Sequence, residues 1–125
     1  MTVATPFLMF EGACEAALTL YVELIPESLI LSLERHANGA GVQMARASIA
    51  GLEIMANDSP ISHAFTFTPS TSLFVTCEDE AAFERISAGL AEGGQLLMPP
   101  GDYGFSRRFA WMNDRFGVSW QVNLP

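Results

Sequence analysis

The first half of the chain contains several short apolar runs and one segment whose apolar residues have helical spacing. Phe7–Phe10 is a brief apolar run that is typical of a buried strand. Over residues 13–24 the apolar side chains recur at three- and four-residue spacing, which predicts an amphipathic helix that Pro26 ends. Three further strands are predicted at residues 29–34, 42–50 and 52–57.

The same order returns after a polar loop at residues 58–70. Residues 72–77 are rich in strand-forming side chains. The acidic run 78–80 then suits the exposed N–H groups of a helix start, and Gly93-Gly94 ends that helix. The remaining strands are predicted at residues 95–98, 105–113 and 118–124.

The two halves therefore share one order of elements. Their last strands also align, residues 51–57 with 117–123, with Gly and Asn matching at both ends. Such a repeat favours an internal duplication. We predict an α+β fold of two βαβββ modules, at about residues 4–60 and 70–125, within a single domain over residues 1–125.

The charge of the chain limits the classes of binding partner that we expect. Fourteen acidic residues face six basic ones, all arginines, for a net charge of −8. Nucleic acids and anionic membranes are bound by clustered Lys and Arg, so we expect neither as a partner. The absence of lysine excludes lysine Schiff-base chemistry. No apolar stretch is long enough to span a bilayer and the N-terminus does not resemble a secretory signal, so we expect a cytoplasmic protein.

Three stretches resemble a known family. Residues 6–12, followed by the helix residues 15–21, resemble the opening of the PhnB-like branch of the vicinal oxygen chelate superfamily. The stretch 109–121 is similar to the signature of that branch, F-G-W-x-x-D-x-F-G-x-S-W-Q, and residues 58–67 also fit.

This resemblance implies a glyoxalase-like fold in which each module curls a mixed four-stranded sheet into half of a cup, and it implies a homodimer. Members of the branch are commonly named after 3-demethylubiquinone 3-methyltransferase. Other members of the superfamily are glyoxalases, extradiol dioxygenases and antibiotic-binding resistance proteins. A shared fold does not dictate a shared activity.

The resemblance also indicates where metal ligands lie in metal-dependent relatives. The corresponding positions here are the first strand, where only the Met9 thioether is a weak donor, then Met55, a site near Ser72, and Gln121. A divalent ion needs several nitrogen or oxygen donors held together. We therefore predict no metal site.

Period-two alternation places Ser119, Gln121 and Asn123 on one face of the last strand, and the resemblance turns that face into the cup. Ser119 and Gln121 are thus candidates for ligand binding, although Gln121 is equally compatible with a hydrogen bond inside the protein. The apolar candidates for lining the pocket are Met9, Met55, Phe67, Phe74 and Trp111. Ordinary core packing is the alternative for these residues.

One pair of polar residues is a candidate for acid–base chemistry. His63 lies in the same loop as Asp58, and a histidine oriented by a carboxylate is suited to act as a general base. A loop histidine is more often solvated or a cap, and His36, beside a glycine-rich loop, is interpreted as surface.

These features favour a metal-independent protein that binds a small hydrophobic or aromatic molecule in an apolar cup, with no cofactor. One alternative is an enzyme of the 3-demethylubiquinone methyltransferase type. Against it, no glycine-rich loop follows a strand and opens a helix, as a Rossmann-type nucleotide site requires. The other alternative is a metal-dependent lyase or dioxygenase.

Overall fold

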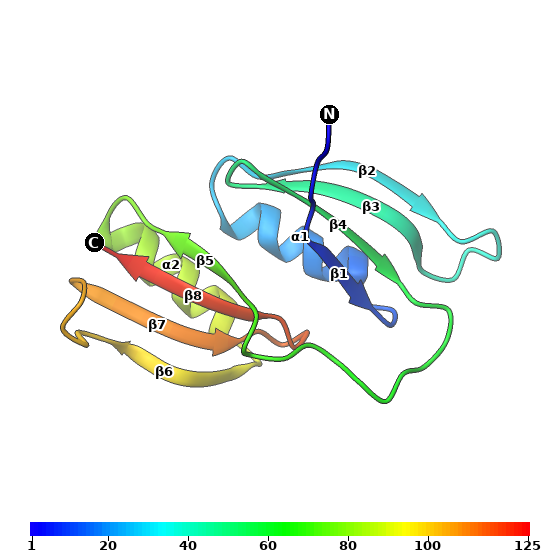
Figure 1. The fold of residues 1–125 in the computed structure, drawn as a ribbon. Coiled ribbons are helices and arrows are strands. Elements are labelled where there is room, and N and C mark those ends of the chain that lie inside the picture. The colour runs from blue at the N-terminus through cyan, green and yellow to red at the C-terminus, as the bar shows by residue number, and fades with distance from the viewer. The chain divides into compact units, whose positions relative to one another are not determined.

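The computed structural model describes residues 1–125, which form two compact units, residues 1–63 (unit 1) and 64–125 (unit 2). Each unit contains one helix and one four-stranded sheet (Figure 1). This confirms the predicted α+β class and the repeated order of elements. That the units together make a single domain stays a prediction.

Unit 1 consists of β1 (Phe7–Phe10), α1 (Cys14–Leu24), β2 (Leu29–Arg35), β3 (Val42–Ile49) and β4 (Leu52–Asp58). Its strand order is β1-β4-β3-β2, with β1 parallel to β4 and the other pairs antiparallel. No helix in either unit is both long and apolar enough to span a membrane.

Unit 2 consists of β5 (Ser72–Thr76), α2 (Glu80–Ala91), β6 (Gln95–Gly101), β7 (Arg108–Asn113) and β8 (Ser119–Leu124). Its order, β5-β8-β7-β6, repeats that of unit 1, again with the first strand parallel to the last. The registers correspond as well: Phe7 lies opposite Met55 on β4, and Phe74 lies opposite Gln121 on β8.

Two strand ends differ from the prediction. β6 continues beyond residue 98 through Pro99 and Pro100, which an edge strand tolerates because one of its sides forms no ladder hydrogen bonds. β7 begins at Arg108 rather than at Phe105, so residues 102–107 form a loop instead of a strand.

In each unit the helix packs on one face of its sheet. Cys14, Leu18 and Tyr21 of α1 are fully buried, as are Ala45 and Ala47 of β3 beneath it. In unit 2 the buried residues of α2 meet the alternate positions of β7 and β8 that point away from Gln121. These buried residues are Phe83, Ile86, Leu90, Ala110, Met112, Trp120 and Val122. Trp120 is therefore core, on the face that period-two alternation sets opposite Ser119 and Gln121.

The two helices are capped in different ways. In unit 2, Asp79 precedes α2 and its Oδ1 accepts a hydrogen bond from the Ala82 N–H at 2.8 Å, the usual arrangement for an N-cap. In unit 1 the N-cap is Ala13, which has no capping side chain. Asp58, at the end of β4, supplies the missing acceptor to the Cys14 N–H.

The β7–β8 turn of unit 2 is organised by Asp114, which is 3 % exposed. Its Oδ1 accepts from the N–H groups of Phe116 and Val118, at 2.8 and 3.0 Å. Its Oδ2 accepts from the Trp120 indole Nε1–H at 2.9 Å. One carboxylate thus links the turn to the largest side chain of the core.

Candidate functional site

The face of the unit 2 sheet opposite α2, here called open face 2, carries most of the predicted site residues. Strand register arranges its side chains in three rows across the sheet. The middle row is Met98, Trp111, Gln121 and Phe74. The row toward the β7–β8 turn is Gln95, Asn113, Ser119 and Ser72, and the row at the other end is Gly101, Phe109, Asn123 and Thr76.

Hydrogen bonds fix the indole of Trp111 on this face. Its Nε1–H donates to Ser119 Oγ at 2.9 Å, and the hydroxyls of Ser119 and Ser72 share a further hydrogen bond of 2.9 Å. Ser119 is buried, at 1 % exposure. Its hydroxyl is therefore used to position Trp111, and its direct contact with a ligand stays a prediction.

An aromatic cluster lies at one end of open face 2. The centroid of the Phe109 ring is 5.0 Å from the ring centroid of Phe105, 6.2 Å from that of Tyr103 and 6.3 Å from that of Phe74. Phe109 is buried beneath its neighbours, whereas Phe74 and Phe105 are 56 % and 63 % exposed. The cluster thus presents exposed aromatic surface supported by a buried ring.

Sequence reasoning missed Tyr103 and Phe105 as site residues because it placed them in or beside a strand. The signal that identifies their loop is Gly104 between them, which adopts a φ of +96°, a conformation typical of a glycine turn. Phe67, by contrast, lies outside the strands: a Cβ added at Gly117 would be 3.6 Å from its ring. Phe67 therefore packs at the β7–β8 turn.

The corresponding face of unit 1 brings together Met9 and Met55. Met55 lies opposite Phe7 on β1 and Arg46 on β3, and Met9 lies opposite Asn57. Both methionines are half-buried, and Phe7 is 47 % exposed. Apolar side chains therefore line this face near β1.

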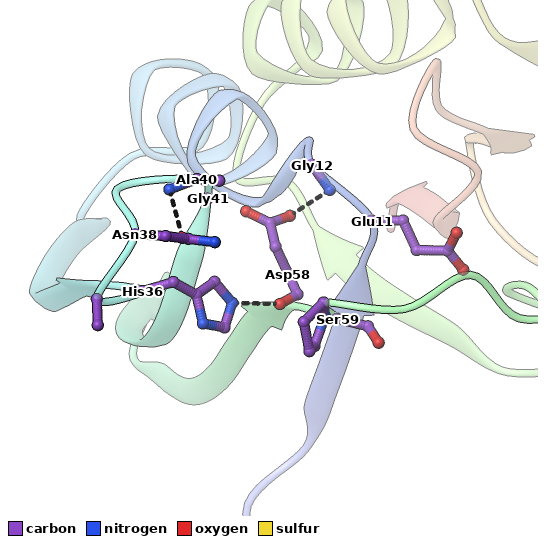
Figure 2. Close-up of a pocket in the computed structure, with 10 residues that line it drawn as sticks. Glu11, Gly12, His36, Asn38, Ala40, Gly41, Asp58 and Ser59 are labelled. Carbon is purple, nitrogen blue, oxygen red and sulfur yellow. Dashed lines mark hydrogen bonds between the residues drawn. The ribbon is translucent and has the colours of Figure 1, made fainter.

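Asp58 and His36 line a pocket of about 630 Å³ in unit 1 (Figure 2). The Asp58 carboxylate is 3 % exposed and accepts three backbone hydrogen bonds. Oδ1 accepts from Gly12 and Cys14, at 2.7 and 2.9 Å, and Oδ2 accepts from Val42 at 2.9 Å. This carboxylate joins β4 to the start of α1 and to the start of β3.

The histidines contact the same region. His36 Nε2 donates to the backbone carbonyl of Asp58 at 2.8 Å, so His36 is part of the pocket wall rather than plain surface. His63 Nε2 is hydrogen-bonded to Ser59 Oγ at 2.8 Å, and its backbone N–H donates to Glu11 Oε2 at 3.3 Å. Catalysis by His63 with Asp58 stays a prediction.

The two cysteines are buried thiols. Burial raises the pKa of Cys14 to about 12, and the charges of Asp58 and Glu15 act in the same direction. Burial also raises the pKa of Cys77. A protonated, enclosed thiol is a poor nucleophile and a poor metal ligand.

The side chains at the positions that imply a metal in relatives do not fit one. Met55 lies opposite Phe7, and Gln121 lies opposite Phe74, so each pair offers at most one neutral donor. Ser72 and Ser119 hydrogen-bond each other. Mn²⁺, Zn²⁺ and similar ions require several carboxylate, imidazole or thiolate donors, which neither face provides in these rows.

Comparison with known proteins identifies relatives along the whole chain. The model of the 3-demethylubiquinone-9 3-methyltransferase family matches residues 2–123. A PhnB protein from Bacillus cereus has a similar structure, with 43% identity, a TM-score of 0.95, and coverage of 99% of this chain and 100% of that one. Protein YjdN from Escherichia coli is 26% identical over 96% of this chain and 93% of its own.

A more distant structure shares the fold. The glyoxylase/bleomycin resistance/dioxygenase domain from Frankia is 15% identical, with a TM-score of 0.71 over 99% of this chain and 91% of that one. At this identity the likeness concerns the fold alone, which is the predicted glyoxalase-like fold.

Proposed function

Because the chain belongs to the 3-demethylubiquinone-9 3-methyltransferase family, whose fold serves several chemistries, we propose its function from the side chains of its open faces. The protein binds a small apolar or aromatic molecule without a metal ion. The observation that carries this proposal is the middle row of open face 2, where Trp111 and Phe74 flank Gln121.

The composition of this row matches what small-molecule sites require. Such sites are lined mainly by apolar and aromatic side chains, with a few polar groups that orient the ligand. Trp111 is held in place through Ser119, and Phe74 is 56 % exposed beside the buried ring of Phe109. A flat ligand that stacks on Phe74 would bury exposed aromatic surface without disturbing the core.

The proposal is tested with 2-methoxynaphthalene, a flat aromatic probe that has no hydrogen-bond donor, in the presence of EDTA. Titration into ¹⁵N-labelled protein should shift the Trp111 Nε1–H and Gln121 side-chain amide signals. Phe74→Ala should weaken binding about ten-fold, since it removes the exposed ring. Phe65→Ala is the matched control, because Phe65 is similarly exposed, at 63 %, but lies outside the strands. Absence of shifts at Trp111 and Gln121 would refute the proposal.

A methyltransferase activity is the second candidate, and the family description favours it. Such an enzyme must bind a methyl donor, normally S-adenosylmethionine. A Rossmann-type site for this donor requires a glycine-rich loop between a strand and a helix. Here the β1–α1 connection contains one glycine, Gly12, and the β5–α2 connection contains none. Calorimetric titration with S-adenosylmethionine distinguishes the two candidate functions. Binding at micromolar affinity would favour the methyltransferase over a protein that only binds its ligand.

We also propose that the protein is a homodimer, as the family resemblance implies. Sedimentation velocity at micromolar concentration tests this directly, since a species of 13.5 kDa would contradict it.

A further inference from the structure

Three asparagine side chains have a carbonyl oxygen that is shielded from water and has no hydrogen-bond partner: Asn57, Asn113 and Asn123. Such buried, unpaired polar atoms are rare in native proteins, and each one costs stability. Asparagine is also depleted in strands, and all three belong to strands: Asn113 ends β7, and Asn57 and Asn123 stand one residue before the ends of β4 and β8. Three of them on strands therefore call for an explanation beyond folding.

Each of these unpaired carbonyl oxygens is here called an orphan acceptor. That of Asn123 is the orphan closest to the aromatic cluster. It lies opposite Phe109 on β7 and Thr76 on β5, one row from Gln121 and Phe74. Phe109 has no donor, and the hydroxyl of Thr76 makes no hydrogen bond to the amide. The protein thus places an unsatisfied acceptor beside an exposed aromatic surface and offers it no donor of its own.

The amide is able to reach a ligand on this face. Strand register places Asn123 on open face 2, and Asn123 as a residue is half-buried while its Oδ1 is shielded. The terminal torsion of asparagine is broad, so a small rotation exposes the carbonyl oxygen at low cost. Pairing that oxygen then recovers the penalty of leaving it unsatisfied.

The same orphan recurs in unit 1. Asn57 stands at the repeat position of Asn123, two residues after Met55 as Asn123 is two residues after Gln121, and its Oδ1 is also shielded and unpaired. An accidental packing defect would not be expected at equivalent positions of both modules. The recurrence indicates an acceptor that each open face keeps available.

Building on the proposed function, we propose that the ligand of open face 2 is an aromatic molecule that carries a hydroxyl or amine donor, and that Asn123 Oδ1 accepts this donor while the ring stacks on Phe74. Asn123 thereby sets specificity: it selects phenolic or amino-aromatic compounds over the corresponding ethers and hydrocarbons. This assigns a chemical class to a ligand that the apolar row alone leaves undefined.

The experiment compares 2-naphthol with 2-methoxynaphthalene, which differ by the hydroxyl donor. Calorimetry on the full chain should show about ten-fold tighter binding of 2-naphthol, the gain expected from pairing a buried acceptor. Asn123→Leu removes the acceptor while keeping the number and branching of the side-chain heavy atoms, and it should bind the two compounds equally. Asn38→Leu, at an exposed loop position, is the control and should keep the preference.

Stability separates a recognition role from a structural one. If Asn123 only held the fold, Asn123→Leu would lower the melting temperature; an orphan that waits for a ligand predicts an unchanged or higher one. In the wild-type protein, 2-naphthol should also shift the Asn123 side-chain NH₂ signals more than 2-methoxynaphthalene does. This measurement needs no variant.

Equal affinity of the wild-type protein for both compounds would overturn the role of Asn123 and leave the proposed function standing. Retention of the preference in Asn123→Leu would overturn it too. Failure of both compounds to bind open face 2 would refute the proposed function itself.

Discussion

Replacing Asp58 by alanine should destabilise unit 1 strongly, although the sequence suggests a loop residue and a candidate for chemistry; in the structure Asp58 ends β4. The carboxylate is 3 % exposed and accepts from the N–H groups of Gly12, Cys14 and Val42 at 2.7–2.9 Å. These donors belong to the β1–α1 connection, the first turn of α1 and the start of β3. The substitution leaves all three without an acceptor.

The magnitude follows from these three bonds. Each buried N–H that loses its partner costs about 1–3 kcal/mol, and water entering the space left by the carboxylate recovers part of this. We therefore expect a loss of about 3–5 kcal/mol for Asp58→Ala. Asp58→Asn keeps one oxygen but directs an NH₂ group at an N–H donor, so it should lose about 2 kcal/mol. A loss of 3 kcal/mol corresponds to a fall in melting temperature of about 10 °C.

Urea unfolding followed by circular dichroism measures the change. Hydrogen exchange at the Cys14 and Val42 amides assigns it to unit 1, because their protection should fall in parallel. The matched control is Asp102→Ala: its carboxylate also accepts a backbone N–H, that of Gly104 at 2.8 Å, but it is exposed and should cost below about 1 kcal/mol. Asp58→Ala within 1 kcal/mol of wild type would refute the role assigned to this carboxylate.

Three further predictions concern backbone packing, metal and the buried thiol. Gly94→Ala should destabilise unit 2 by more than about 3 kcal/mol in urea unfolding, because the added Cβ would lie 2.1 Å from the carbonyl oxygen of Asn113. Gly101→Ala is the control, because its added Cβ would come no nearer than 3.7 Å to its neighbours and Gly101 has no positive φ; equal losses would contradict this packing. EDTA should leave the affinity for 2-methoxynaphthalene unchanged within two-fold; a large loss that Mn²⁺ restores would show that a metal takes part. Because the pKa of Cys14 is raised to about 12, the unfolded thiol loses its proton first, so the free energy of unfolding should fall as pH rises from 9 toward 12. Cys14→Ala should reduce this slope, and an unchanged slope would assign it to other groups.

Much of the fold is predictable from the sequence because apolar periodicity is a local signal. The stripe of α1 and the alternation of β8 each reflect burial on one side of an element. The errors fall where local signals conflict with position in the sheet. Pro99 and Pro100 suggest the end of a strand, yet β6 is an edge strand that accepts them.

The candidate site is predictable only as far as it depends on alternation. Period two placed Gln121 on the face opposite Trp120, and the structure shows the same arrangement. The hydrogen bonds of Asp58 could not be predicted from the sequence, because its partners Gly12 and Cys14 are 46 and 44 residues away along the chain. Long-range hydrogen bonds of this kind leave no pattern in a single sequence.

The stretch that identifies the family mainly builds the fold. Within residues 109–121, Asp114 binds the turn and the indole of Trp120, and Gly117 adopts a φ of +93° that few other residues tolerate. Five residues of this stretch lie on open face 2: Phe109, Trp111, Asn113, Ser119 and Gln121.

Two residues proposed to select the ligand, Phe74 and Asn123, lie outside that stretch. A relative can therefore keep every signature residue by which the family is recognised and still bind a different molecule. Replacing both residues in one variant, Phe74→Ala with Asn123→Leu, should change ligand preference without loss of stability. A double variant that changed stability but not preference would place specificity elsewhere on the sheet.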